Sequence, residues 1–278
     1  MKQKKHKQFK SYLFSIFIFL IGAFFVDSVY IEPNKLEVKN IEIKKDDVAS
    51  EFAGKSIVFL SDIHYGVGDR SRLDRAVDKI NEINPDVVIL GGDYIDSDAN
   101  LVPECFSKLE KIKASVGIYA VLGNHDMDVK IYSKLKEEFK DSKIELLYND
   151  KVFIRGGNSN IVIAGIPYSK RNSNLNLDLT DLNKDDFVIL ASHNPDLVEQ
   201  QKLLNVDVVL SGHLHGGQIN MLGLERFWMP TAFGQKYKSG IIFKDSLEVI
   251  VSNGLGGSGL PMRFMAEPDI IQIKISKS

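Results

Sequence analysis

The sequence predicts an α/β domain preceded by one apolar helix at its N-terminus. Short apolar runs alternate with amphipathic segments, polar loops follow those runs, and an uncharged stretch near the N-terminus approaches the length of a membrane helix. Alternation of strands and helices is typical of sheets with parallel strands. The 278 residues are 44% hydrophobic and 26% charged, which is ordinary composition for a globular protein.

The charge distribution narrows the class of partner. The chain has 35 basic and 37 acidic side chains, and five of the lysines lie in the first ten residues, so the remainder has a net charge of −7. A body that acidic does not indicate a nucleic-acid-binding protein. The single cysteine, Cys105, excludes a disulfide within the chain and leaves the redox compartment open.

The N-terminal segment predicts a membrane location. Residues 1–10 are basic, and residues 11–31 are expected to form a transmembrane anchor or a signal segment. The uncharged run Ser11–Val26 would span about 24 Å as a helix, and Ser28 to Ile31 would extend it to the ~30 Å hydrocarbon core. The lysines place the N-terminus in the cytoplasm and the body outside. We interpret the segment as an uncleaved single-pass anchor; the alternative is cleavage near Asp27, which would give a secreted protein.

Residues 36–278 are expected to form one catalytic domain. Leu36 to Ile43 alternate between apolar and polar side chains, as in a half-exposed strand. Three strands, each followed by an amphipathic helix, are then expected at Ile57–Leu60, Val87–Leu90 and Ile118–Leu122. Later strands are expected at Val152–Ile154, Ile161–Ile166, Phe187–Leu190, Val206–Leu210, Gly240–Phe243, Leu247–Val251 and Ile270–Ile275.

Five of these strands lead directly into loops that contain Asp, Asn or His. In open α/β sheets, ligands bind beyond the carboxyl ends of the strands. Of the six histidines, His6 lies among the lysines and the other five all lie in these loops. Each loop residue alone could be a turn former, a helix cap or a hydrogen-bonded loop histidine. Their joint occurrence predicts a metal site.

Seven side chains are the predicted metal ligands: Asp62, His64, Asp93, Asn124, His193, His213 and His215. Carboxylate, imidazole and amide donors without a thiolate suit Mn, Fe or Zn. Seven donors are too many for one four-coordinate ion. We therefore predict two divalent transition metal ions, about 3.5–4 Å apart, that share one carboxylate.

The loop motifs resemble those of the calcineurin-like metallophosphoesterases. Asp-x-His, Gly-Asp-x-x-Asp, Gly-Asn-His-Asp, a solitary His and Gly-His-x-His follow in that order from Asp62 to His215. Gly216-Gly217-Gln218 and residues 259–264 are similar to the bacterial membrane-associated branch, which includes phosphodiesterases and UDP-diacylglucosamine pyrophosphohydrolase-type enzymes. The resemblance covers about residues 36–278 and implies a four-layer α/β/β/α sandwich.

The resemblance also implies a role for each site residue. Asp62, His64 and His215 would hold the first metal, and Asn124, His193 and His213 the second. Asp93 would bridge the two ions. His125 would face the scissile phosphate, with Asp126 close by, so these two are the expected catalytic residues.

The predicted reaction is hydrolysis of a phosphodiester or pyrophosphate bond. Two ions would lower the pKa of a bridging water from about 15.7 toward ~7, so that hydroxide attacks in line at neutral pH. Protonated His125 would donate to the leaving oxygen. The alternatives are a phosphomonoesterase acting on phosphoproteins or nucleotides, and a non-catalytic scaffold, which the complete ligand set disfavours.

Residues outside the metal motifs bear on the substrate. An apolar loop follows the last motif and contains Met221, Leu222, Leu224, Phe227, Trp228, Met229 and Phe233. This loop is either a lid over the hydrophobic edge of the sheet or a contact with lipid or an acyl chain, as in a lipid-linked substrate. Arg263 could bind a second phosphate through its fork of donors.

Overall fold

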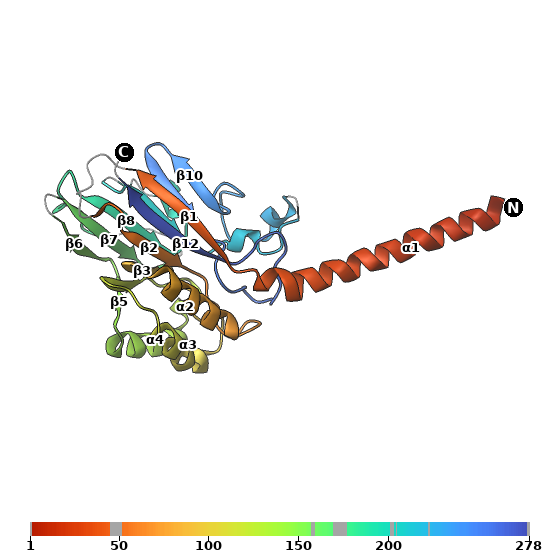
Figure 1. Cartoon of the computed structure of the whole chain (residues 1–278), viewed down its shortest axis with the longest axis horizontal. Coiled ribbons are helices and arrows are strands. Elements are labelled where there is room, and N and C mark those ends of the chain that lie inside the picture. Colours follow the sequence, from red (N-terminus) through yellow and green to blue (C-terminus); the bar gives the residue numbers. More distant parts are fainter. Residues whose placement is uncertain are drawn as a thin grey trace.

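Two six-stranded sheets pack face to face, and α-helices cover the outer face of one of them (Figure 1). This arrangement confirms the predicted α/β class with an N-terminal apolar helix. The computed structural model describes residues 2–44, 52–156, 159–168, 177–200, 203, 205–221 and 223–276. The α-helices of that part of the chain are α1 (Lys2–Val26), α2 (Ser71–Ile83), α3 (Val102–Leu109), α4 (Val129–Asp141) and α5 (Leu197–Gln200).

The first sheet has the strand order β1-β12-β2-β3-β4-β5. Its central strands β2, β3 and β4 are parallel, and β12 runs antiparallel to β2. The bounds of the six strands are β1 Glu37–Lys44, β2 Ser56–Leu60, β3 Val87–Leu90, β4 Gly117–Ala120, β5 Ile144–Leu146 and β12 Asp269–Ser276.

The second sheet has the order β10-β11-β9-β8-β7-β6. Strands β7, β8, β9 and β11 are parallel, whereas β6 and β10 at the two edges are antiparallel to their neighbours. The bounds are β6 Asp150–Arg155, β7 Asn160–Ile166, β8 Phe187–Ser192, β9 Val208–Ser211, β10 Gly240–Lys244 and β11 Leu247–Val251.

The main core lies between the sheets. Strand residues alternate in direction, so Ile57 and Phe59 of β2 face Ile189 and Leu210 of the second sheet, while Val58 and Leu60 face the helices. Helices α2, α3 and α4 bury their apolar sides on that outer face. The outer face of the second sheet packs against α5 and loop residues, so the fourth layer contains little helix in the described part of the chain.

The N-terminal helix projects from one end of the domain (Figure 1). By length and composition the segment His6–Asn34 could cross a membrane. At about 1.5 Å per residue, the 25 residues of α1 span roughly 37 Å. The helix continues through the lysine cluster and passes into a π-helical turn, Asp27–Ile31, at the domain surface.

Candidate metal centre

The predicted ligands follow strands of both sheets and meet where the carboxyl ends of those strands converge. Asp62, Asp93 and Asn124 follow β2, β3 and β4, which lie side by side in the first sheet. His193 follows β8 directly, and His213 and His215 follow β9, its neighbour in the second sheet. Parallel pairing within each sheet therefore brings together side chains that are up to 153 positions apart.

The side chains form two adjoining groups. Donor atoms of Asp62, His64 and His215 lie within 4.8 Å of one another, and so do those of Asp93, His193 and His213. Asn124 joins the second group, because its Oδ1 lies 3.1 Å from Nε2 of His193. The structure thus brings the seven predicted ligands together, and a third group of donor atoms, from His64, Asp93 and His125, lies between the other two.

Asp93 lies between the two groups. Its Oδ2 is 3.4 Å from Nε2 of His64 in the first group and 3.2 Å from Nε2 of His193 in the second. Its Oδ1 accepts a hydrogen bond from the backbone amide of His125 at 2.9 Å. The carboxylate is thus oriented so that one oxygen remains available to both groups.

The backbone at the ligands is strained. Positive φ values, which non-glycine residues rarely adopt, occur at 52° for Asp62, 42° for His64, 55° for Asp93, 72° for His213 and 51° for His215. Such conformations cost about 1–3 kcal/mol each and cluster at functional sites. The strain lowers the free energy of unfolding, and the rest of the fold must offset it to hold these five side chains in place.

Glycines make room for the carboxylates. A Cβ at Gly212 would lie 1.9 Å from Oδ2 of Asp62, and a Cβ at Gly123 would lie 2.1 Å from Oδ1 of Asp93. Neither position could hold a larger residue without displacing a carboxylate. The glycines of the loop motifs are thus required by contact, and not only by turn geometry.

Hydrogen bonds behind the ligands fix the orientation of the rings. Nδ1 of His193 lies 2.8 Å from the backbone oxygen of Gly91, and Nδ1 of His64 lies 3.1 Å from Oδ1 of Asp96. Both contacts leave Nε2 directed at the site, which is the usual arrangement behind a metal-bound histidine. Asp96 was not among the predicted site residues, although the Gly-Asp-x-x-Asp spacing indicated it.

The donor set fits divalent cations. The carboxylates of Asp62 and Asp93 are buried, and Nδ1 of His215 is buried without a hydrogen-bond partner in the part of the chain that the structure describes. Burial lowers the pKa of His213 to about 3 and lowers that of His215, so both rings are neutral and can offer a lone pair. At His64 burial lowers the pKa, but hydrogen bonds with Asp93 and Asp96 outweigh this and raise it to about 10. A cation would have to displace that proton.

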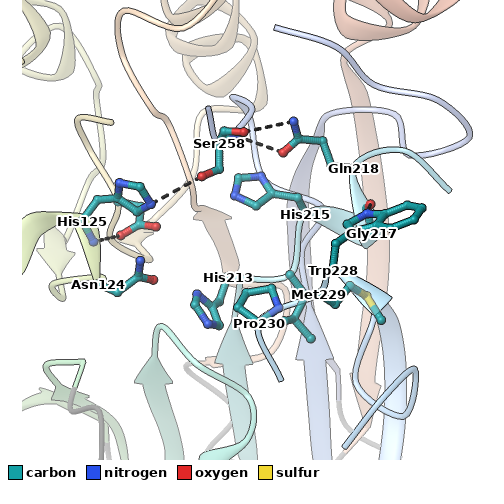
Figure 2. Close-up of a pocket in the computed structure, with 12 residues that line it drawn as sticks. Asn124, His125, His213, His215, Gly217, Gln218, Trp228, Met229, Pro230 and Ser258 are labelled. Carbon is teal, nitrogen blue, oxygen red and sulfur yellow. Dashed lines mark hydrogen bonds between the residues drawn. The ribbon is translucent and has the colours of Figure 1, made fainter. Parts of the chain in front are cut away.

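A cavity of about 230 Å³ opens beside the two groups (Figure 2). Its lining includes His125, His213 and His215 as well as Trp228, Met229 and Pro230. Nε2 of His125 faces the cavity and lies 3.4 Å from Oγ of Ser258. The backbone of Ser258 is bonded to the side chain of Gln218. Its oxygen accepts from Nε2 of Gln218 at 3.2 Å, and its amide donates to Oε1 at 3.0 Å. Ser258 and Gln218 are pocket residues that the sequence did not single out.

Asp126 has a different place from the one expected. Its carboxylate is fully buried and accepts hydrogen bonds from the backbone amides of Asp93 at 2.6 Å, Gly123 at 2.8 Å and Tyr94 at 2.9 Å. Burial raises the pKa of this carboxyl, whereas the amide donors favour its charged form. Asp126 therefore positions the loop that carries Asp93 and does not face the cavity.

Arg263 is not available for a phosphate, so the expected substrate contact is wrong. The side chain is 1% exposed, and its donors bond to the backbone oxygens of Asn253, Gly254, Gly256 and Ala266. The guanidinium group closes the loop between β11 and β12 instead. Sequence alone could not show this, because the loop carbonyls converge only in the folded chain.

The apolar loop after the last motif has some side chains packed on the domain, as a lid would have, and others exposed, as a lipid contact would require. Met229 is buried and lines the cavity together with Trp228, and Phe233 packs against the second sheet. Leu224 and Phe227 are exposed. Leu222 lies outside the described residues.

Comparisons with known proteins point to one family. Residues 55–217 match the family model for calcineurin-like phosphoesterases. The chain is 32% identical over 240 residues to a Danio rerio protein named transmembrane protein with metallophosphoesterase domain, and the match covers 81% of this chain and 54% of that protein. It is also 32% identical over 229 residues to YpbG of Bacillus subtilis, covering 79% and 82% of the two chains.

Two further observations complete the comparison. The crystal structure of TT1561 of Thermus thermophilus aligns with a TM-score of 0.46 at 13% identity, over 73% of this chain and 91% of that one. The chain spans about half the length of the two vertebrate relatives, which are both named transmembrane proteins with a metallophosphoesterase domain.

Proposed function

Because the chain belongs to the calcineurin-like phosphoesterase family and is a metal-dependent phosphoesterase, we propose that it hydrolyses a phosphodiester or pyrophosphate bond with two divalent metal ions at the membrane surface. The observation that carries this proposal is the position of Asp93. One carboxylate oxygen lies within 3.4 Å of imidazole nitrogens from both ligand groups. A shared carboxylate of this kind is typical of two-metal hydrolases.

Each ligand has a role in this proposal. Asp62, His64 and His215 would hold one ion, Asn124, His193 and His213 the other, and Asp93 would bridge them; manganese, iron and zinc all suit the donors. When bound, the ions would supply an activated water and positive charge for in-line attack on phosphorus. The protein's contribution is a fixed geometry, maintained by Asp96, Asp126 and the backbone oxygen of Gly91.

His125 would act as the proton donor to the leaving oxygen. Its Nδ1 lies 2.7 Å from the backbone oxygen of Asp96, so Nδ1 carries a proton and Nε2 points to the cavity. Donor atoms of His125 also lie within 4.8 Å of His64 and Asp93, so distance alone does not separate a donor from a ligand. The greater exposure of the His125 side chain, 28% against 0% for His64 and His193, favours the donor role, because it leaves Nε2 accessible to a substrate in the cavity.

The anchor and the cavity support a substrate held at the membrane. The segment His6–Asn34 could span a bilayer, and two relatives are named transmembrane proteins. The lysines in the first turns of α1 favour a cytoplasmic N-terminus and an extracytoplasmic catalytic domain; a secreted form after cleavage is the alternative. The apolar wall of Trp228 and Met229 would suit the non-phosphate part of a lipid-linked substrate.

Two model substrates test the proposal in the full-length chain purified in detergent. With Mn²⁺ we expect turnover of bis-p-nitrophenyl phosphate, little turnover of p-nitrophenyl phosphate, and no activity after chelation. Preferential monoester hydrolysis would favour the phosphomonoesterase instead. Silence on both, with metal bound, would favour a non-catalytic protein. Membrane lipids fractionated by headgroup would then identify the natural substrate.

A further inference from the structure

Six large apolar side chains are exposed on two neighbouring loops at the end of the domain where α1 ends. They are 43–72% exposed, although most side chains of this type in the domain are buried. We call these six the apolar rim: Met221, Leu224, Phe227, Trp228, Leu260 and Met265. Exposed apolar surface gathered in this way marks an interaction site.

Backbone hydrogen bonds join the two loops of the rim. The amide of Asn220 donates to the oxygen of Phe264 at 2.8 Å, and the amide of Phe264 donates to the oxygen of Gln218 at 2.9 Å. The side chain of Gln218 donates to the oxygen of Leu260 at 3.0 Å. The rim is thus one surface built from two segments, and not two independent loop tips.

The base of α1 is attached to the same loops. The ring centroids of Phe24 and Phe264 are 4.9 Å apart, and the amide of Arg263 donates to the oxygen of Ser28 at 2.8 Å. The carboxylate of Glu32 accepts from the amide of Ala266 at 2.8 Å. Figure 1 shows α1 leaving the domain at the end where the blue loops gather. A bilayer that contains α1 therefore lies on the side of the rim.

We propose that the apolar rim contacts the bilayer that α1 enters and sets the mouth of the metal cavity against the lipid headgroups. The rim and the cavity share Trp228, and Ser258 of the cavity lies two positions before Leu260. The guanidinium group of Arg226, 4.8 Å from the ring of Phe227, is exposed at the rim and can reach lipid phosphates. This inference rests on the proposed anchoring by α1, but not on the proposed hydrolysis.

The single tryptophan of the chain is a reporter for this contact. Full-length protein is reconstituted in phosphatidylcholine vesicles whose acyl chains either do or do not carry bromine near the glycerol. We expect about a twofold loss of Trp228 emission in the brominated vesicles, because side chains at an interface reach the boundary of the acyl chains. The matched control, Trp228→Phe/Phe153→Trp, moves the indole to an exposed site on β6 at the far end of the domain and should not be quenched.

A second variant tests the rim itself. Leu224→Ser/Phe227→Ser changes two rim residues that do not line the cavity, so turnover of soluble bis-p-nitrophenyl phosphate should stay within twofold. Quenching of Trp228 should fall, and so should hydrolysis of phosphoesters embedded in the vesicles.

Several outcomes would overturn the inference. Unquenched Trp228 in protein that floats with the vesicles would do so, as would a blue-shifted but unquenched emission, which would mean that protein covers the rim. Failure to float would remove the inference together with the anchoring. Quenching without hydrolysis of any substrate would leave the inference standing and defeat the proposed function.

Discussion

The imidazole Nδ1 of His125 lies 2.7 Å from the backbone oxygen of Asp96. Because a carbonyl oxygen only accepts, Nδ1 carries a proton of its own, and Nε2, which faces the cavity, would carry the proton that is donated. The carboxylate of Asp96 also forms a hydrogen bond with His64. Asp96 thus orients one ring that would bind metal and one that would move a proton.

The variant His125→Gln tests this division of roles. We expect turnover of a diester to fall about 10²–10⁴-fold, the usual contribution of a general acid, with the metal content unchanged. Steady-state kinetics and metal analysis of the same sample measure both. A large loss of metal would show that His125 is a ligand and that the proposed roles are wrong.

The variant Asp93→Asn should lose metal. An amide has one oxygen and no charge, so it cannot bridge two cations between His64 and His193 as a carboxylate can. We expect metal stoichiometry to fall from two ions to one or fewer, with loss of activity. Asp98→Asn is the control, because Asp98 is exposed and only caps the turn Ala99–Leu101. Full occupancy in Asp93→Asn would argue against the bridge.

The variant Gly212→Ala should disturb the first metal group by contact alone. The added methyl would lie 1.9 Å from Oδ2 of Asp62 and 2.3 Å from Oγ of Ser61. Overpacking of this kind typically costs about 1–3 kcal/mol, so we expect a lower melting temperature and weaker metal binding. Gly22→Ala, whose methyl would meet nothing within 4 Å, should change neither.

The variant Arg263→Met should unfold at lower temperature without a change in KM. Loss of the guanidinium group removes a donor from four buried backbone oxygens, of which that of Gly254 also accepts from the amide of Asp269 at 3.4 Å. Each oxygen that stays unpaired costs about 1–3 kcal/mol. We expect a loss of about 3 kcal/mol or more, measured by unfolding in detergent. Arg155→Met on β6, an exposed position, should stay within about 0.5 kcal/mol of the parent. A raised KM in the folded variant would show that Arg263 does contribute to substrate binding.

The variant Ser133→Cys tests the orientation in the membrane. Ser133 is exposed on α4, whereas the native Cys105 is buried and should not react. In intact cells an impermeant maleimide should label Ser133→Cys and leave the parent chain unlabelled. Labelling only after permeabilisation would place the catalytic domain in the cytoplasm.

The convergence of the candidate ligands was predictable because it depends on local rules. Each follows an apolar strand, and parallel pairing brings strand ends together whatever the details of packing. The strand β5 was missed because Ile144–Leu146 is too short to show a period. The roles of Asp126 and Arg263 were misjudged because each bonds to backbone groups, and backbone convergence leaves no pattern in side-chain types.

The loop between β11 and β12, which Arg263 closes, contacts both a candidate metal ligand and the segment that follows α1. Its Gly256 amide donates to the oxygen of the ligand Asp62 at 2.7 Å, and its Ala266 amide donates to Glu32 at the foot of α1. In a chain anchored by α1, these two hydrogen bonds would fix the distance between the reaction centre and the lipid surface. The enzyme would then hydrolyse phosphoesters whose phosphorus lies at one distance from the bilayer, and would not hydrolyse the same bond held further from it.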